Sequence, residues 1–129
     1  MSSRIDQLLE RARAALPHRP RPEELDGLIS SGALVVDIRP VGLRHRDGGL
    51  AGAVVVDRNQ LEWRLDPTSE FRLPGFDDPD RTVVLVCDEG YASSLAAATL
   101  QELGLRRATD LEGGFQALRE HRLNVRPAP

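Results

Sequence analysis

The 129-residue chain is short of cysteine and lysine: Cys87 is its single cysteine, and all 17 of its basic residues are arginine. One cysteine excludes an internal disulfide framework and a cysteine-built zinc site, and it favours a reducing compartment, so we expect a cytoplasmic protein. The three histidines show no spacing typical of metal ligands, and we expect no metal.

Long apolar runs and a strong net charge are absent as well. No apolar stretch approaches the roughly 20 residues that a membrane span requires. The formal net charge of −3 gives no bulk attraction to nucleic acid or to an anionic membrane. We therefore expect neither as a partner, and the length is that of a single domain.

What the chain does have is a strand, loop and helix pattern around its cysteine. The run from Thr82 to Val86 is β-branched and apolar without alternation, which predicts a strand buried on both faces. Cys87 follows it, Gly90 permits a tight turn with positive φ, and a helical spacing of apolar residues runs from Leu95 to Leu103. Inward N–H groups and the positive end of the helix dipole favour an anion there, such as a thiolate.

Short apolar strands alternate with helical patterns along the rest of the chain. Besides the run before Cys87, they lie at 34–38, 53–56 and 108–111. This alternation predicts a parallel α/β sheet of four or five strands.

Four segments resemble, in the same order, motifs of the rhodanese-like sulfurtransferase family. Cys87 to Ser93 resembles its Cys-x-x-Gly-x-x-Ser loop, and Val35 to Arg39 resembles its first core strand with an Asp-x-Arg ending. Gly49 to Ala53 resembles its Gly-His-Ile-x-Gly-Ala segment, with Leu50 in place of His, and Leu111 to Phe115 resembles its Leu-x-Gly-Gly-x motif. Each motif is weak alone, but together they cover residues 22–123.

The resemblance implies a rhodanese-like α/β fold: a central parallel sheet of about five short strands with helices on both faces, plus an extra N-terminal helix. We expect an N-terminal helix and Pro/Arg linker at 1–21, a rhodanese-like domain at 22–125 and a frayed tail at 126–129. The N-terminal helix lies outside the resemblance. It is interpreted as an extra layer docked on the domain, with a dimerisation or partner helix as the alternative.

The resemblance also implies a reaction. Cys87 is the expected nucleophile, which takes a sulfane sulfur from thiosulfate, polysulfide or a persulfide and passes it to a thiol or cyanide through a cysteine persulfide. The chemistry requires no second cysteine, metal or cofactor, and the acceptor thiol can belong to a partner protein. The loop expected to bind the persulfide and substrate consists of Asp88, Glu89, Gly90, Tyr91, Ala92 and Ser93.

Five further residues are expected near the site. Arg58, Trp63 and Arg64 follow the 53–56 strand and are candidates for the pocket rim, because loops at strand C-termini gather around ligand sites in α/β sheets. As the only tryptophan, Trp63 is more typical of a core residue. Asp37 is expected to be structural, satisfied by backbone N–H groups or by an arginine, with Arg44 as the candidate partner.

The loop departs from the family in its charge. Asp88 and Glu89 are acidic, and Ala92 stands where arginine is common. If both carboxylates face the pocket, they repel a dianionic donor, and a persulfide, a polysulfide or a partner's sulfur is favoured over thiosulfate. If they face solvent, screening makes the effect modest.

Three other interpretations remain beside the sulfurtransferase. Without the loop context, a lone cysteine is typically a buried small residue. A rhodanese-like domain can also be a non-catalytic binding or regulatory module, since fold does not fix function, although the presence of Cys87 favours the enzyme. Cysteine phosphatases of similar fold need Cys-x5-Arg, and the sixth residue after Cys87 is Ser93, which argues against that activity.

Overall fold

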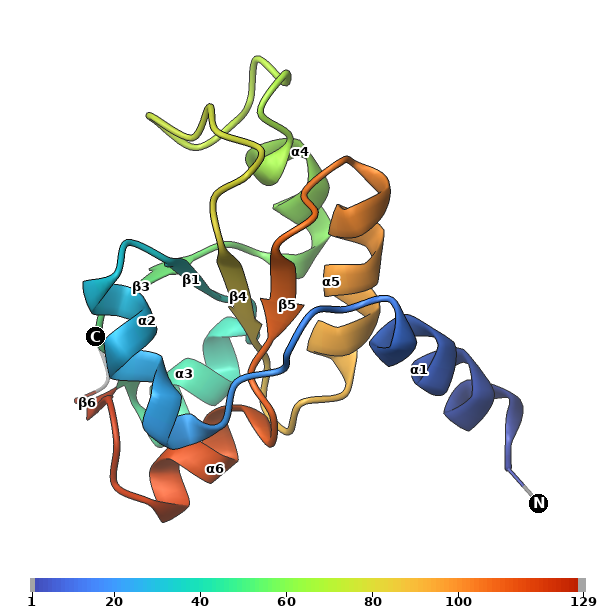
Figure 1. Cartoon of the computed structure of the whole chain (residues 1–129). Coiled ribbons are helices and arrows are strands. Elements are labelled where there is room, and N and C mark those ends of the chain that lie inside the picture. Colours follow the sequence, from blue (N-terminus) through green and yellow to red (C-terminus); the bar gives the residue numbers. More distant parts are fainter. Residues whose placement is uncertain (1, 128–129) are drawn as a thin grey trace.

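The computed structural model describes residues 2–127, which build a four-stranded parallel sheet of order β3-β1-β4-β5 (Figure 1). The strands are β1 (Leu34–Asp37), β3 (Ala53–Val55), β4 (Val83–Val86) and β5 (Ala108–Asp110). Because all four run in the same direction, their carboxyl ends meet at one edge, and the loops that follow them converge there. The predicted α/β fold is confirmed, with four strands in the parallel sheet.

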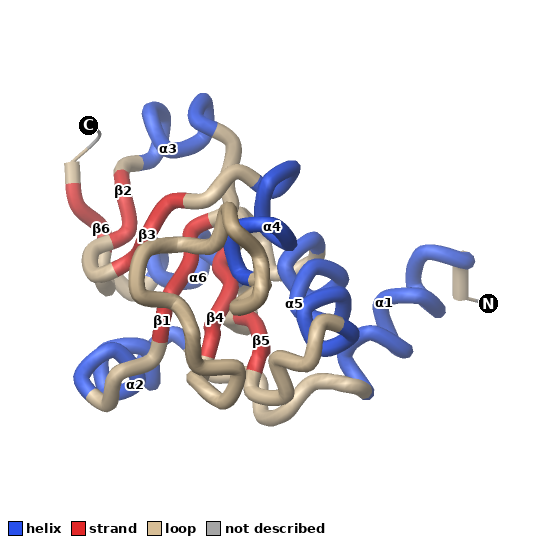
Figure 2. The backbone as a smooth tube through the Cα atoms, turned by 90° about the horizontal axis from the view of Figure 1, so that it is seen from above, coloured by secondary structure: helices blue, strands red, loops and turns tan. Residues whose placement is uncertain are grey.

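Helices cover both faces of this sheet, as expected (Figure 2). On one face, α4 (Leu61–Leu65) and α5 (Ala92–Glu102) pack against Val36 and Leu85. On the other face, α2 (Leu25–Ser30) and α6 (Gly114–Glu120) pack against Val35 and Val84. Alternate residues of one strand therefore enter two separate cores, which explains why the strand sequences are apolar throughout.

A small antiparallel pair completes the strand pattern. Strands β2 (Gly49–Leu50) and β6 (Val125–Arg126) pair with each other, and α3 (Val41–Asp47) precedes β2. This corrects the prediction of a frayed tail from residue 126, because Arg126 pairs with Gly49. Residues 128–129 of that predicted tail lie outside the described residues.

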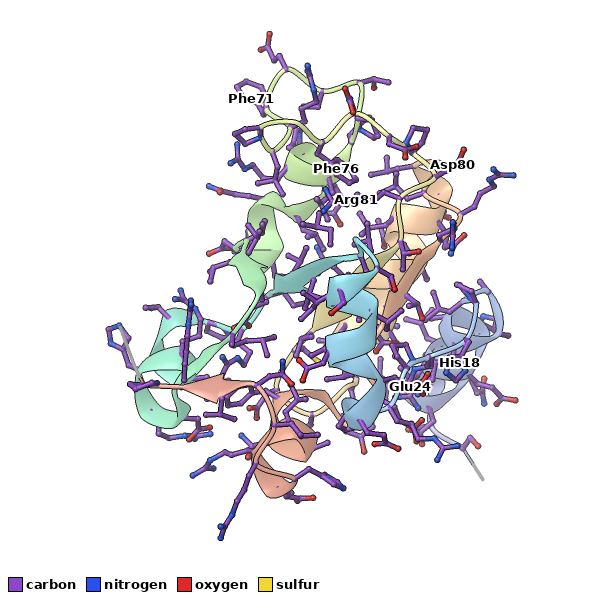
Figure 3. The ribbon with its side chains drawn as sticks, turned by 60° about the vertical axis from the view of Figure 1, so that its left-hand side comes forward. His18, Glu24, Phe71, Phe76, Asp80 and Arg81 are labelled. Atoms are coloured by element: carbon purple, nitrogen blue, oxygen red, sulfur yellow. The ribbon has the colours of Figure 1, made fainter. Side chains whose placement is uncertain are left out.

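The connections between the main elements include two 3₁₀ turns, η1 (Pro22–Glu24) and η2 (Arg58–Gln60), and the 66–80 loop before β4. Within that loop Phe76 is buried against the core, whereas Phe71 is exposed (Figure 3). None of the helices among residues 2–127 is long and apolar enough to cross a lipid bilayer.

The N-terminal helix α1 (Arg4–Ala14) lies beside α5 and extends away from the sheet (Figures 1 and 2). Ser3 begins it with a capping box that includes Asp6. The linker then returns across β5, where the Thr109 hydroxyl donates to the His18 carbonyl and the Glu112 N–H donates to the Pro20 carbonyl. The helix and linker are thus docked on the domain as an extra layer.

Candidate active site

Cys87 follows β4 on the loop that leads into α5, and it is 7% exposed. Its Sγ accepts hydrogen bonds from the backbone N–H groups of Gly90 (3.2 Å) and Ser93 (3.3 Å). Gly90 has φ +86°, and a Cβ there would lie 2.8 Å from the Gly113 nitrogen. Only glycine fits this turn, and the turn is what brings the two N–H groups onto the sulfur.

Further N–H groups of the same loop are free. Those of Asp88, Glu89 and Tyr91 donate to no protein acceptor within residues 2–127. Backbone N–H groups gathered on one turn form an anion-binding concavity. The loop can therefore hold more negative charge than one thiolate.

The N-terminus of α6 binds this loop through backbone hydrogen bonds. Phe115 N–H donates to the Cys87 carbonyl (2.9 Å), and Gln116 N–H donates to the Asp88 carbonyl (3.0 Å). A Cβ on Gly114 would lie 2.7 Å from both carbonyl oxygens and from the Gly90 nitrogen. The Gly-Gly pair thus permits close contact between α6 and the loop, and the bound carbonyls orient the loop peptides.

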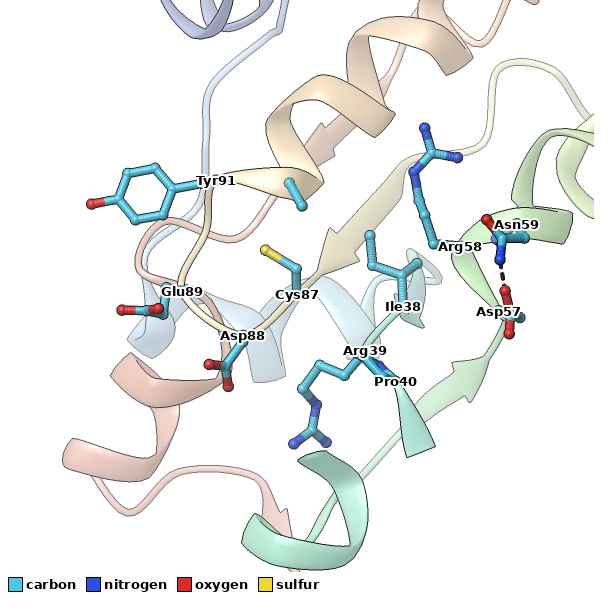
Figure 4. A pocket seen from close by; sticks show the side chains of 11 residues that line it. Ile38, Arg39, Pro40, Asp57, Arg58, Asn59, Cys87, Asp88, Glu89 and Tyr91 are labelled. Atoms are coloured by element: carbon cyan, nitrogen blue, oxygen red, sulfur yellow. Dashed lines mark hydrogen bonds between the residues drawn. The ribbon is translucent and has the colours of Figure 1, made fainter. Parts of the chain in front are cut away.

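A cavity of about 470 Å³ lies over Cys87, lined by the loops that follow β1, β3 and β4 (Figure 4). Its walls include Ile38 and Pro40 after β1, and Arg58 after β3. Cys87 is itself one of the residues that line this space (Figure 4). Although Cys87 is buried and also contacts the core, this cavity is where a donor or acceptor would approach it.

The acidic side chains of the loop are turned away from the sulfur. In Figure 4 the carboxylates of Asp88 and Glu89 point away from Sγ. The Asp88 carboxylate accepts a hydrogen bond from Gln116 Nε2 (2.9 Å), and Glu89 is exposed. Across the cavity, Arg58 is engaged with Glu62 (2.9 Å). Both residues nevertheless line the cavity, so they repel an anionic donor there, and solvent screens the exposed Glu89 more than the half-buried Asp88.

Of the three residues expected on the pocket rim, the structure places only Arg58 there. Trp63 and Arg64 line a separate hollow with Val55 and Phe71. Trp63 is 59% exposed, so its interpretation as a core residue was wrong too. It lies on a short helix that buries only Leu61 and Leu65, and it points outward from that face.

Asp37 forms a buried ion pair, and its partner is Arg39 and not Arg44. Arg39 donates from Nε (3.0 Å) and Nη2 (2.8 Å) to the Asp37 carboxylate, and both residues are buried. The Arg39 guanidinium also lies 3.5 Å from the centre of the Phe115 ring. This pair joins the end of β1 to α6 beneath the cavity.

Sequence reasoning missed three residues next to the cysteine loop. Asp110 is fully buried at the end of β5 and accepts hydrogen bonds from the Ser93 (2.7 Å) and Ser94 (2.8 Å) hydroxyls. Arg13 and Arg19, from α1 and the linker, both donate to the Gly90 carbonyl. The position of Asp110 at a strand end was a usable signal. Nothing in the sequence distinguished Arg13 and Arg19, because every basic residue of the chain is arginine.

Comparison with known proteins agrees with this geometry. The sequence profile of the rhodanese-like domain matches residues 21–121. Thiosulfate sulfurtransferase GlpE of Pseudomonas fluorescens is 33% identical over 101 residues, covering 76% of this chain and 81% of that protein.

Two solved structures are similar as well. A protein of unknown function from Rhodopseudomonas palustris, described as a possible tyrosine phosphatase, has a TM-score of 0.84 at 31% identity, covering 98% of this chain and 96% of its own. The rhodanese homolog of Thermus thermophilus has a TM-score of 0.56 at 37% identity, covering 78% of this chain and 100% of its own.

The profile match includes all four parallel strands, the Cys87 loop and α6, and it leaves out α1 and nearly all of the linker. The four motifs expected from the sequence fall inside it. The chain belongs to the family of rhodanese-like domains.

Proposed function

We propose that the chain is a sulfurtransferase with Cys87 as its nucleophile. The observation that carries the proposal is a cysteine that lines an open cavity and whose Sγ accepts hydrogen bonds from two backbone N–H groups at the N-terminus of a helix. The thiosulfate sulfurtransferase GlpE relatives support the same activity.

The reaction has two steps. The Cys87 thiolate attacks the sulfane sulfur of a donor, the bond between that sulfur and the rest of the donor breaks, and the leaving group departs with the electron pair. With thiosulfate the leaving group is sulfite, and with a polysulfide it is the chain shortened by one sulfur. The product on the protein is the persulfide anion Cys87–S–S⁻, and the thiol proton has gone to solvent.

An acceptor thiolate or cyanide then attacks the outer sulfur, and Cys87 leaves as the thiolate. In both steps the reacting form of Cys87 carries its negative charge on sulfur, as the attacking thiolate and then as the persulfide anion. The loop from Asp88 to Ser93 supplies N–H groups to that charge throughout, and no group has to move far between the two steps. The acceptor is either a small thiol or a thiol of a partner protein, and the cycle as proposed uses no cofactor.

Mass spectrometry of the intact protein tests the proposal. Incubation with thiosulfate or inorganic polysulfide is expected to add about 32 Da, one sulfur atom, to the wild type and nothing to Cys87→Ser. Cyanide should remove the adduct and release thiocyanate. A wild type that takes up sulfur from neither donor contradicts the proposal and leaves the non-catalytic module.

Tyrosine phosphatase activity is the second candidate, because the Rhodopseudomonas palustris neighbour is described as a possible member of that class. A cysteine phosphatase grips phosphate with an arginine six residues after its cysteine, and Ser93 stands at that position here. Arg13 and Arg19 lie beside the loop but donate to the Gly90 carbonyl. We expect no hydrolysis of p-nitrophenyl phosphate above that of Cys87→Ser.

A further inference from the structure

The N-terminal segment makes its closest polar contact with the cysteine loop at one carbonyl group. Arg13 Nη2, from the last turn of α1, donates to the Gly90 oxygen at 2.8 Å. Arg19 Nη2, from the linker, donates to the same oxygen at 3.2 Å. Arg13 also donates to Ser94 Oγ (3.1 Å) and lies 5.5 Å from the centre of the Tyr91 ring. Two cations thus fix one peptide of the loop.

That peptide joins Gly90 to Tyr91, and it is trans. In a trans peptide the carbonyl and the following N–H point in opposite directions. With the carbonyl held by Arg13 and Arg19, the Tyr91 N–H points away from the N-terminal segment. Among residues 2–127 it has no protein acceptor, and Tyr91 lines the cavity.

A second series of polar contacts leads from the same segment to the Cys87 sulfur. Arg19 Nε donates to Asp110 Oδ1 (2.8 Å), and Asp110 Oδ2 accepts the Ser93 hydroxyl (2.7 Å). Ser93 Oγ lies 3.1 Å from Cys87 Sγ. A line of contacts therefore runs from Arg19 through Asp110 and Ser93 to the nucleophile.

The hydroxyl of Ser93 has only one proton to give. While Cys87 is a thiol, its S–H can donate to Ser93 Oγ as Ser93 donates to Asp110. Once the sulfur is a thiolate or a persulfide anion, that S–H is gone and the sulfur needs a donor. Ser93 can turn its proton to the sulfur if Asp110 remains satisfied, and Arg19 and Ser94 keep it so.

We propose that Arg13 and Arg19 are positioning residues for sulfur transfer, which hold the Gly90–Tyr91 peptide and Asp110 so that loop N–H groups and the Ser93 hydroxyl serve the charged sulfur. The inference rests on the proposed function. Both arginines precede the region that the family profile matches, which begins at residue 21. The N-terminal segment is thus part of the machinery of this chain rather than an appendage.

The test compares Arg13→Gln and Arg19→Gln with Arg11→Gln. Arg11 lies on the same helix, is exposed and makes no hydrogen bond or ion pair within residues 2–127, so the control removes an equal charge. The rate of persulfide formation is followed by rapid quenching and intact mass over a range of donor concentrations up to saturation, well below the melting temperature of each variant. We expect each test variant to be roughly 10- to 100-fold slower in kcat with little change in KM, and the control to match the wild type.

Two further readouts separate positioning from loss of structure. Free guanidinium ion should partly restore the rate of Arg19→Ala, because it can occupy the space beside Asp110, and it should not restore a misfolded protein. Alkylation of Cys87 by iodoacetamide at fixed pH should slow in both test variants and not in Arg11→Gln, because it depends on the same stabilised anion without any sulfur donor.

The outcomes are distinct. Test variants that load sulfur and react with iodoacetamide as fast as the control overturn the positioning role while leaving the sulfurtransferase intact. The positioning role is also overturned if the loss of rate in the test variants is proportional to their unfolded fraction and guanidinium does not restore it. A wild type that takes up no sulfur from thiosulfate or polysulfide overturns the proposed function, and with it the reaction that these arginines are said to serve.

Discussion

Arg39 donates three hydrogen bonds to Asp37, two from its guanidinium and one from its backbone N–H, and neither side chain is exposed. The same guanidinium donates to the Gly48 carbonyl and stacks on the Phe115 ring. One buried ion pair therefore ties the end of β1, the C-terminal end of α3 and α6 together beside the cavity that Cys87 lines.

Removing the charge of Asp37 should unfold the domain far more easily. Asp37→Asn leaves Arg39 as an uncompensated buried cation, which is expected to lower the free energy of unfolding by about 3–5 kcal/mol. Urea titration at neutral pH measures this. Asp80→Asn is the control, because its ion pair with Arg106 is exposed and should not move the midpoint measurably. Equal midpoints for the two variants would contradict the structural role of Asp37.

The partner of Asp37 illustrates what the sequence could and could not predict. Residues i and i+2 of an extended chain project to the same side, so their spacing predicts that Asp37 and Arg39 pair. We assigned Arg44 as the partner instead. Trp63 carried a signal as well, because Leu61 and Leu65 are spaced i and i+4 on the covered face and Trp63, two residues from each, lies on the opposite side of the helix. Arg126 pairs with Gly49, which is distant in the sequence, and the residues around either one do not predict such a pairing.

The cysteine loop is the opposite case. Its strand, its turn at Gly90 and its helix were predictable because each depends on neighbouring residues only. The contacts that complete it, from Asp110 and from Arg13 and Arg19, depend on how distant elements dock. Local sequence therefore predicts the loop around Cys87 and the N–H groups at its sulfur, while the groups that hold this loop in place need the three-dimensional structure.

Gly90 should be indispensable for sulfur loading. Gly90→Ala places a Cβ 2.8 Å from the Gly113 nitrogen at φ +86°, so the loop must shift and the N–H groups must leave the sulfur. We expect loading by thiosulfate or polysulfide to fall at least tenfold, as intact mass would measure. Gly75→Ala is matched in φ, at +75°, with open space around it. It should lose about 1 kcal/mol of stability and keep the wild-type rate.

Asp47 should make stability sensitive to acid. Its carboxylate is held by Arg46 and by Gln116, and the hydrogen bonds from the Arg46 guanidinium hold the pKa of Asp47 far below its usual value of 3.8. A depressed pKa stabilises the fold above the unfolded value, and that contribution is lost as pH falls through the folded value. The melting temperature of Asp47→Asn should therefore lie below that of the wild type at pH 7 and at pH 5.

Below about pH 4 the two melting temperatures should begin to converge, because the wild type then progressively loses the contribution that the variant never had. Scanning calorimetry between pH 2.5 and 7 measures the convergence. A difference that stays constant over this range would show that Asp47 acts through packing rather than through its charge.

Charge at the loop surface should tune the choice of donor. Glu89→Arg changes the charge beside the cavity by two units, and Glu89 is exposed and makes no hydrogen bond in the described part of the chain. At roughly 10 Å in screened water, this change is worth a few tenths of a kcal/mol for each charge on a dianion. We expect kcat/KM for thiosulfate to rise roughly two- to fivefold. Asp88→Arg should act in the same direction, with the added loss of its contact to Gln116.

Glu102→Arg is the control for net charge, because it makes the same change at the far end of α5. It should leave kcat/KM near the wild-type value. Steady-state assays at two ionic strengths complete the test: the gain in Glu89→Arg should shrink at high salt, because exposed charges are screened there. A gain that is equal in both variants, or one that is insensitive to salt, would contradict a local electrostatic effect. An unchanged or lower kcat/KM in Glu89→Arg would mean that the acidic loop does not limit the use of thiosulfate.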